Sequence, residues 1–302
     1  MSASRRVLIT GAGSGLGQAL ALRYAAAGCR VACVDLSVER SDATRARLAG
    51  SGLGKALAER HARRGDTVAC VDRDRARADA TCAALAGTGH LAFAADVGDD
   101  DSMQALADDV RAVWGGLDML YNNAGIASGG AMVDTTMAEW RQILEIDLLG
   151  VVRGCRLFLP AMLAAGKGHI VNTASFAGLA GAPGIMTYGV AKAGVVALSE
   201  QLRAEVEARG VRVSVVCPSF FRTNLMDEAL GNERVKALAL RMMDTSPDTL
   251  DSVADAVLAD VDAGRFLILP TKREPMRWRL KRWFPQAYFR MLLARTARAM
   301  KS

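Results

Sequence analysis

The residues of this chain that could do chemistry are Tyr188 and Lys192, with Ser175 thirteen residues before the tyrosine. Positions four apart share one face of a helix, so the phenol and the ammonium would be neighbours. A phenol has an ordinary pKa of about 10, and a nearby cation lowers that pKa by favouring the phenolate. The tyrosine could then exchange protons near neutral pH, while the serine hydroxyl holds a carbonyl oxygen. Alone, a Tyr-x-x-x-Lys pattern is more often just a solvated helix face.

A glycine-rich segment near the N-terminus changes that balance. The apolar residues 7–9 lead into residues 10–17 (Thr-Gly-Ala-Gly-Ser-Gly-Leu-Gly), and a helical pattern follows over residues 18–27. A strand, a glycine-rich turn and a helix together make a phosphate site, because backbone N–H groups point at the anion. Asp35 follows the next predicted strand, over residues 30–34. A carboxylate there accepts hydrogen bonds from a ribose 2′-hydroxyl and repels a 2′-phosphate, which favours NAD over NADP.

With three further motifs, the sequence resembles the short-chain dehydrogenase/reductase family over residues 5–270. The further motifs are Asp96-Val97, the run Asn122-Asn123-Ala124-Gly125, and Pro218 with Thr223 five residues later. They resemble, in that order, the family's adenine-contacting pair, its motif after the fourth strand and its segment that holds the nicotinamide amide. The resemblance implies a Rossmann-like α/β fold, a doubly wound parallel sheet in a single domain.

The resemblance also implies the site. Ser175, Tyr188 and Lys192 match the catalytic trio, and NAD(H) is the expected cofactor, with NADP(H) as an alternative. The implied cofactor contacts come from the glycine turn, the strand ends and the catalytic helix: Thr10, Gly11, Gly13, Ser14, Gly15, Leu16, Gly17, Asp35, Asp96, Val97, Asn123, Ala124, Gly125, Tyr188, Lys192, Pro218 and Thr223.

Two residues depart from the family pattern. Asp147 stands where the family has an asparagine that helps to hold a proton-relay water near the lysine, and Ser219 stands where it has a glycine. A carboxylate beside Lys192 would favour the protonated amine. We count Asp147 among the catalytic candidates and expect Asp147→Asn to keep comparable turnover.

The expected function is hydride transfer between NAD(H) and a carbonyl or secondary-alcohol substrate of hydrophobic character. The alternative is an NAD-binding regulatory or scaffold protein with impaired catalysis. No metal is expected, since the histidines His61, His90 and His169 have no ligand spacing. The candidate walls of the substrate pocket are apolar or small: Ser128, Phe176, Met186, Phe220, Phe221, Leu225 and Met226.

The cofactor half contains a tandem repeat. Residues 14–50 recur as residues 51–87, with 23 identities among the 37 aligned pairs. One helix–strand–helix unit has therefore been inserted. Either the sheet gains a strand or one copy is extruded from it. We favour the first copy as the cofactor site because it alone follows Thr10 and Gly11 directly; the second copy, with Asp72, stays an alternative.

The segment after residue 270 has a different composition. Residues 271–302 contain ten Lys/Arg against the single acid Glu274, so a charge of +9 is concentrated there while the whole chain carries +6. Aromatic residues are interleaved with the bases, which predicts one or two amphipathic helices interrupted near Pro285. Packing over the substrate cleft or against another subunit is favoured, peripheral contact with an anionic membrane is the second possibility, and a nucleic-acid partner is not expected.

Composition sets the remaining expectations. Hydrophobic residues make up 51% of the 302, enough for one large α/β domain over residues 1–270. Six cysteines without paired spacing suit a reducing cytoplasm, and no signal core or membrane span is expected. Strands are predicted at 90–94, 117–121, 169–173, 212–217 and 266–269, and helices at 102–114, 137–165, 186–209 and 247–262. The helices 137–165 and 186–209 would join a homodimer or homotetramer.

Overall fold

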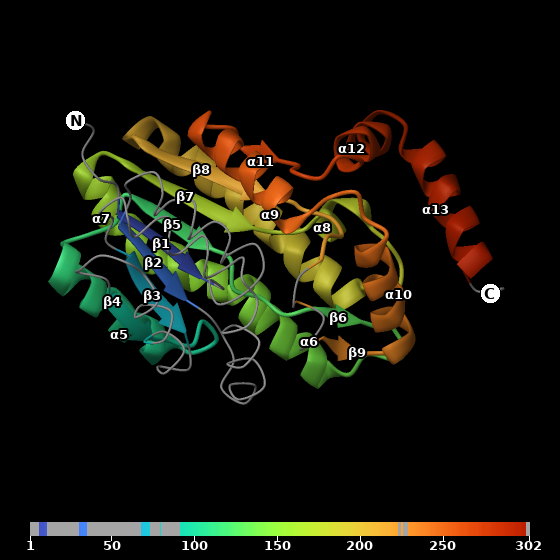
Figure 1. The fold of residues 1–302 in the computed structure, drawn as a ribbon, viewed down its shortest axis with the longest axis horizontal. Coiled ribbons are helices and arrows are strands. Elements are labelled where there is room, and N and C mark those ends of the chain that lie inside the picture. Colours follow the sequence, from blue (N-terminus) through green and yellow to red (C-terminus); the bar gives the residue numbers. More distant parts are fainter. Residues whose placement is uncertain are drawn as a thin grey trace.

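Eight parallel strands form the central sheet, in the order β10-β8-β7-β5-β1-β2-β3-β4 (Figure 1). The computed structural model describes residues 6–10, 30–34, 68–72, 79, 91–222, 225 and 229–299. Every strand pairing in this sheet is parallel, which confirms the doubly wound α/β fold. The strands are β1 (Arg6–Thr10), β2 (Arg30–Val34), β3 (Val68–Asp72), β4 (Leu91–Ala94), β5 (Met119–Asn122), β7 (Gly168–Thr173), β8 (Val211–Val216) and β10 (Leu267–Ile268).

Helices cover the sheet and enclose the apolar core. The long helices α7 and α9 contact β5, β7 and β8, and α5 packs on β4 and α7. Their inward residues recur at helical spacing, as Met103, Leu106 and Val110 do along α5. The helices are α5 (Asp100–Trp114), α6 (Met137–Leu144), the π turn η1 (Glu145–Leu149), α7 (Gly150–Ala165), α8 (Phe176–Ala180), α9 (Met186–Val206), the 3₁₀ turn η2 (Glu207–Arg209), α10 (Glu233–Asp244), α11 (Leu250–Asp262), α12 (Glu274–Trp283) and α13 (Pro285–Ala299).

Both copies of the repeated strand lie in the sheet. β2 and β3 are parallel neighbours, and their register pairs Val31 with Val68 and Cys33 with Cys70. Each residue of the first copy therefore lies beside its own equivalent in the second. Of the two arrangements considered above, the sheet has gained a strand. β4, which carries the chain to Asp96, is separated from β2 by the inserted β3.

The sheet has its topological switch point at β1. β1 pairs with β2 on one side and with β5 on the other. The chain builds β2, β3 and β4 outward from β1 and then returns to place β5 on the other side of β1. In open α/β sheets ligands bind at such a point, beyond the carboxyl ends of the strands. The site is therefore sought above β1, β5 and β7.

Most elements predicted from the sequence are confirmed. The predicted helices 137–165 and 186–209 have these outer bounds, with the first divided by the π turn η1. The short helix α8, the helix α10 and a small parallel pair, β6 (Ser128–Gly129) with β9 (Leu230–Gly231), were not predicted. α8 and the β6–β9 pair are too short to show a period, whereas the amphipathic pattern of α10 was a usable signal that the sequence analysis missed.

One described stretch, Met137–Ala165, is long and apolar enough to cross a membrane by length and composition, with a mean hydropathy of 1.6. It comprises α6, η1 and α7. Ile143, Val151 and Phe158 from this stretch belong to the apolar core. Long helices buried in the core of a folded domain have the same composition, so this stretch is weak evidence of a membrane span.

Candidate active site

Tyr188 and Lys192 are one turn apart on α9, as their spacing predicts. The Lys192 ammonium lies 5.7 Å from the centre of the Tyr188 ring. Lys192 is 3% exposed, whereas Tyr188 is partly exposed. The cation is therefore buried close to the ring, while Tyr188 keeps some exposed surface.

Lys192 is held by two oxygens. Its Nζ donates to the Thr173 carbonyl at 3.2 Å and lies 3.3 Å from Oδ2 of Asp147. Thr173 is the last residue of β7, so this bond ties α9 to the carboxyl end of the sheet. An ammonium has three N–H donors. Within the described residues one donor remains, which fits a ribose hydroxyl of a nicotinamide cofactor.

Asp147 is fully buried and sits in the π turn η1. The Gly150 N–H bonds to the Glu145 carbonyl five residues back, which defines the wider turn. Oδ1 of Asp147 accepts a hydrogen bond of 2.8 Å from the N–H of Ile126. The carboxylate thus joins three elements: the π turn, the loop after β5 and α9.

Ser175 begins α8 directly after β7. Its Oγ accepts a hydrogen bond from the Ala177 N–H at 3.1 Å, which caps the helix. Its hydroxyl donates to the Pro218 carbonyl over a long 3.4 Å, and it lies close enough to Tyr188 to lower the pKa of the phenol. The structure therefore brings the three residues of the expected catalytic trio together at one edge of the sheet.

The electrostatics correct one expectation. Burial raises the pKa of Tyr188, Lys192 lowers it, and Asp147 raises it again, so the pKa lies above its ordinary value rather than below it. Burial also raises the pKa of Asp147, and the charge of Lys192 offsets this only in part. Burial alone would lower the pKa of Lys192, but Asp147 and Tyr188 raise it. Asp147 therefore weakens the activating effect of the lysine on the phenol.

The loop after β5 approaches this pair closely. A Cβ on Gly125 would lie 3.1 Å from Oδ1 of Asp147 and 3.2 Å from Nζ of Lys192, so a side chain there would press on both groups. Ala124 is buried, and Oδ1 of Asn123 accepts a hydrogen bond from the Thr173 hydroxyl at 3.2 Å. This part of the expected cofactor surface lies beside the trio.

A buried polar network supports the site from below. The Asn122 amide donates to Oδ1 of Asn172 at 2.9 Å, and the Asn172 amide donates to the Ser199 hydroxyl at 3.0 Å. These residues link β5, β7 and α9. Sequence reasoning missed Asn172 and Ser199; the available signal was an asparagine within the apolar strand of residues 168–173.

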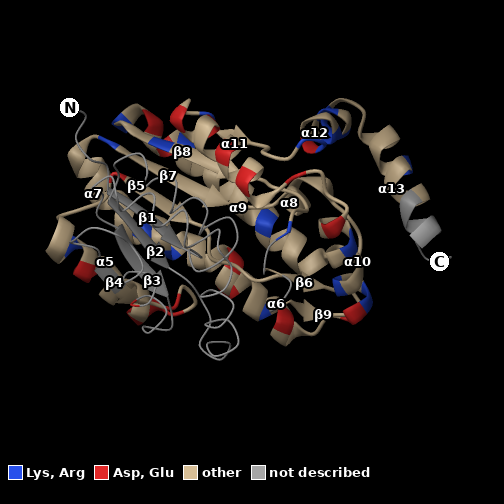
Figure 2. Ribbon diagram, viewed as in Figure 1, with Lys and Arg blue, Asp and Glu red and all other residues tan. Residues whose placement is uncertain are grey.

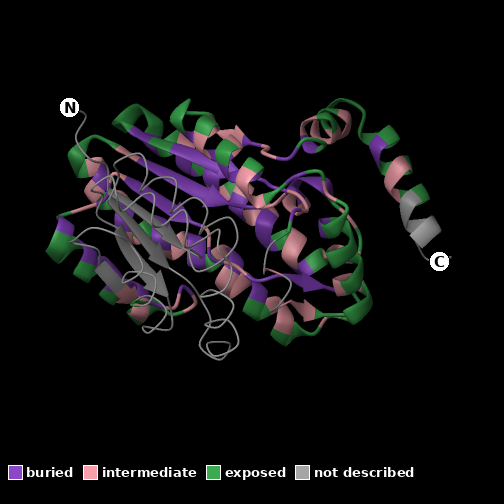
Figure 3. Ribbon diagram, viewed as in Figure 1, coloured by how far each residue is buried: buried purple, intermediate pink, exposed green. Residues whose placement is uncertain are grey.

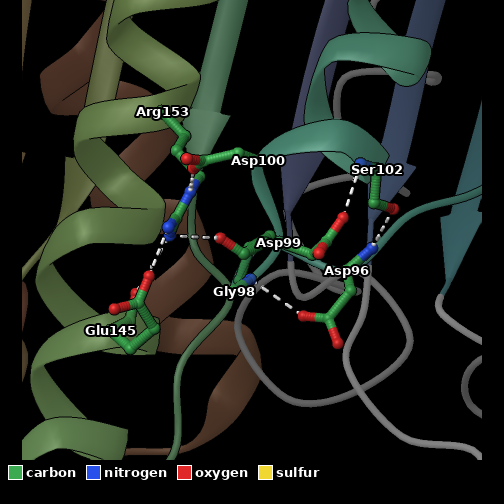
Figure 4. A network of polar contacts seen from close by, with 8 residues as sticks. Asp96, Gly98, Asp99, Asp100, Ser102, Glu145 and Arg153 are labelled. Atoms are coloured by element: carbon green, nitrogen blue, oxygen red, sulfur yellow. Dashed lines mark hydrogen bonds and ion pairs between the residues drawn. The ribbon is translucent and has the colours of Figure 1, made fainter.

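Asp96 and Val97 follow β4 in a second network (Figure 4). The Gly98 N–H donates to Oδ1 of Asp96 at 2.8 Å, and the Asp96 N–H donates to the Ser102 hydroxyl at 2.9 Å. Arg153 of α7 donates to the Val97 carbonyl at 3.1 Å. It also pairs with Asp100 and Glu145. Arg153, also missed from the sequence, therefore clamps the segment after β4 against the π turn.

The remaining residues predicted from the sequence have different positions. Thr10 ends β1, and the buried Pro218 accepts hydrogen bonds from the Phe176 N–H and Ser175. His169 is buried, with its Nε2 2.8 Å from the Ser214 hydroxyl, in a structural role. Outside the described residues lie Gly11, Gly13, Ser14, Gly15, Leu16, Gly17, Asp35, His61, His90, Thr223 and Met226.

The candidate substrate walls divide into two groups. Phe220 and Leu225 pack with Ala127 and Met243 in a small apolar cluster near α10. Ser128, Phe176 and Phe221 are buried, whereas Met186 is exposed. The Ser128 hydroxyl accepts a hydrogen bond from Thr187 of α9 at 3.0 Å, which gives it a structural contact.

Comparison with known proteins identifies the fold and chemistry. The profile described as short chain dehydrogenase matches residues 5–49 and 48–234. A D-threitol dehydrogenase of Mycolicibacterium smegmatis is 34% identical over 260 residues, covering 85% of this chain and 86% of that protein. A cis-4-hydroxycyclohexanecarboxylate dehydrogenase of Sinomonas cyclohexanicum is 40% identical over 227 residues, covering 74% and 76%.

A solved structure gives the same result. A short-chain dehydrogenase/reductase of Burkholderia phymatum in complex with NAD superposes with a TM-score of 0.74 and 26% identity, covering 92% of this chain and 93% of that chain. The chain belongs to the short-chain dehydrogenase family. This dehydrogenase is an oxidoreductase acting on CH–OH groups. Its profile match divides near residue 49, at the junction of the two repeated units.

Proposed function

We propose that this chain transfers a hydride between NAD(H) and a secondary alcohol or ketone of hydrophobic character. The observation that carries the proposal is the position of Tyr188 beside both Ser175 and Lys192 at the carboxyl edge of the sheet, with the Lys192 ammonium 5.7 Å from the centre of its ring. A phenol with a hydroxyl on one side and a buried cation on the other can exchange a proton with a substrate oxygen.

Each residue then has a distinct task. Tyr188 accepts the hydroxyl proton in alcohol oxidation and returns it in ketone reduction. The Ser175 hydroxyl donates to the substrate oxygen, where negative charge develops; its long bond to Pro218 costs little to exchange. Lys192 stabilises the phenolate and offers its remaining donor to the ribose. When bound, the nicotinamide supplies the hydride chemistry.

The strand order supports the first repeated copy as the cofactor site. Asp35 directly follows β2, the strand next to β1, whereas Asp72 ends β3, one strand further out. Strands lie about 4.8 Å apart, so the end of β2 is nearer than the end of β3 to a ribose held at β1. Because the inserted β3 lies between β2 and β4, Asp96 and Val97 at the end of β4 lie about one strand spacing further from β1 than they would without it. In this proposal the adenine meets the end of β3 in place of that pair.

The substrate proposal rests on apolar surroundings. Phe220 and Leu225 present an apolar cluster on the segment that follows Pro218. One relative named above acts on a cyclohexane-ring alcohol. We therefore favour a ring or other hydrophobic secondary alcohol. Assembly as a homodimer or homotetramer through the helices 137–165 and 186–209 stays a proposal, supported by the exposed apolar residues Leu149, Met186 and Val190.

The test compares wild type with Tyr188→Phe on cis-4-hydroxycyclohexanecarboxylate, D-threitol and simple cyclohexanols with NAD⁺. Tyr188→Phe should lower kcat/KM by about 100-fold or more while NADH binding, followed by fluorescence, is unchanged. Tyr288→Phe, on the C-terminal helix α13, is the matched control and should keep full activity. Unaltered turnover in Tyr188→Phe would refute the proposed role.

A second candidate is a protein that binds NAD(H) for regulation and has impaired catalysis. The observation that favours it is the inserted strand β3, which separates β2 from β4 in the cofactor half. In that case wild type would bind NADH yet turn over none of the alcohols, and Tyr188→Phe would leave binding unchanged.

A further inference from the structure

The helix α12 attaches the two C-terminal helices to the body of the molecule. Glu274, at the start of α12, is buried, Trp278 packs against the core, and Lys281 donates to the Leu179 carbonyl of α8. α13 packs on α12 through the buried Tyr288. Beyond this contact α13 extends away from the sheet (Figure 1).

Much of α12 and α13 is exposed (Figure 3), and several of the exposed residues are large and apolar. Met276 and Trp283 are 72% and 73% exposed, and they lie seven residues apart on one face of α12. Phe284 is exposed at the junction. Phe289 and Leu293, four residues apart on α13, are 55% and 54% exposed. Such an apolar face costs free energy in water unless something covers it.

Basic residues are concentrated on α12 (Figure 2). Five bases are exposed over residues 272–290: Lys272, Arg273, Arg279, Arg282 and Arg290. The only acid of the segment, Glu274, is buried and bonded to Arg277 at 2.9 Å. No carboxylate on the described residues of α12 and α13 therefore balances the exposed charge.

We propose that α12 and α13 form a docking surface for an anionic lipid membrane, the basic-aromatic face. Apolar and aromatic side chains enter the region between headgroups and acyl chains, while arginines beside them reach the anionic headgroups. A second copy of the same face is a poorer occupant, because two surfaces without exposed acids would repel each other. Residues 1–270 carry a net charge of −3, so binding to an anionic surface depends on this segment.

The anchor of this face is close to the proposed chemistry. α12 contacts α8, and Ser175 caps the N-terminus of α8. When the protein is docked, its active site therefore lies close to the lipid surface. This position suits a substrate that partitions into membranes. The docking proposal does not depend on the catalytic one, since it concerns binding of the intact chain to lipid.

The experiment is co-sedimentation of the full chain with vesicles of phosphatidylcholine alone and of phosphatidylcholine with phosphatidylglycerol. Wild type should bind only the vesicles that contain phosphatidylglycerol, and high salt should release the protein from them. The triple variant Arg279→Gln, Arg282→Gln, Arg290→Gln should lose binding by more than about tenfold. Trp283→Ser with Phe289→Ser should lose it to a similar extent, because it removes the apolar part and keeps the charge.

The matched control removes three exposed bases elsewhere, with Arg209→Gln, Arg234→Gln and Arg241→Gln; it should bind as wild type does. Thermal melting checks that every variant is folded. Absence of wild-type binding, or equal loss in the control, overturns the proposal. If Trp283→Ser with Phe289→Ser instead converts an oligomer to a monomer in sedimentation velocity, and no vesicles are bound, the face is an interface between copies.

Discussion

The carboxylate of Asp147 lies 3.3 Å from the ammonium of Lys192, and neither side chain has appreciable contact with solvent. The pair joins the π turn η1 to the catalytic helix α9. It keeps the lysine charged, because Asp147 raises the pKa of Lys192. It also places a negative charge near the phenol of Tyr188, which opposes the activation that the lysine provides.

Asp147→Asn should shift the pH dependence of alcohol oxidation toward lower pH and keep comparable turnover. The working base is the phenolate, so the rate rises with pH through the pKa of Tyr188. Removing the carboxylate charge lowers that pKa, since Asp147 raises it. The asparagine can still accept the hydrogen bond from Ile126. The measurement is kcat/KM against pH.

Asp118→Asn is the control, because Asp118 pairs with Lys167 beside the amino end of β5. It should leave the profile unchanged. A large loss of turnover in Asp147→Asn with an unshifted profile would contradict the electrostatic account and give the carboxylate a task of its own.

Asp35→Ala should weaken NADH binding by about tenfold or more, the value of a hydrogen bond to a charged group. The substitution should also reduce the preference for NADH over NADPH, because no carboxylate then repels the 2′-phosphate. Asp72→Ala, at the end of β3, should leave both affinities unchanged. Fluorescence titration gives these affinities. The reverse pattern would mean that the second copy holds the cofactor.

Arg153→Leu should lower the free energy of unfolding by about 1–2 kcal/mol, since Arg153 bonds the Val97 carbonyl and two carboxylates. The estimate is modest because Asp100 is largely exposed. NADH affinity should change little if β3 has displaced Asp96 and Val97 from the adenine. Arg156→Leu, exposed on the same helix, is the control for urea unfolding. Weaker NADH binding in Arg153→Leu would restore the adenine role of that pair.

Gly154→Ala should destabilise the fold by about 2–4 kcal/mol. A Cβ at this position of α7 would lie 2.0 Å from Oδ1 of Asn122. It would break the buried bond from Asn122 to Asn172. Gly189→Ala on α9 is the matched control: its Cβ would meet only the Ala177 carbonyl, at 3.7 Å, so a helix-favouring residue should be neutral or stabilising. Urea unfolding compares the two.

Much of the site was predictable because its signals are local. Tyr188 and Lys192 needed only the period of a helix, and the family resemblance added Ser175 and the strand ends. Asn172, Ser199 and Arg153 were not found, since each acts through contacts with elements distant in the sequence. The raised pKa of Tyr188 was also missed, because spacing shows the neighbouring cation but not the burial or the carboxylate beside it.

The sequence alone determined the α/β class, the tandem repeat and the basic composition of the C-terminal segment, because strand and helix periods, identities and charge are properties of neighbouring residues. Tertiary structure alone decided that β3 enters the sheet next to β2, that Asp147 meets Lys192, and that α13 leaves an apolar face uncovered. These outcomes depend on which elements pack together and in what register. No local pattern of residues specifies that choice.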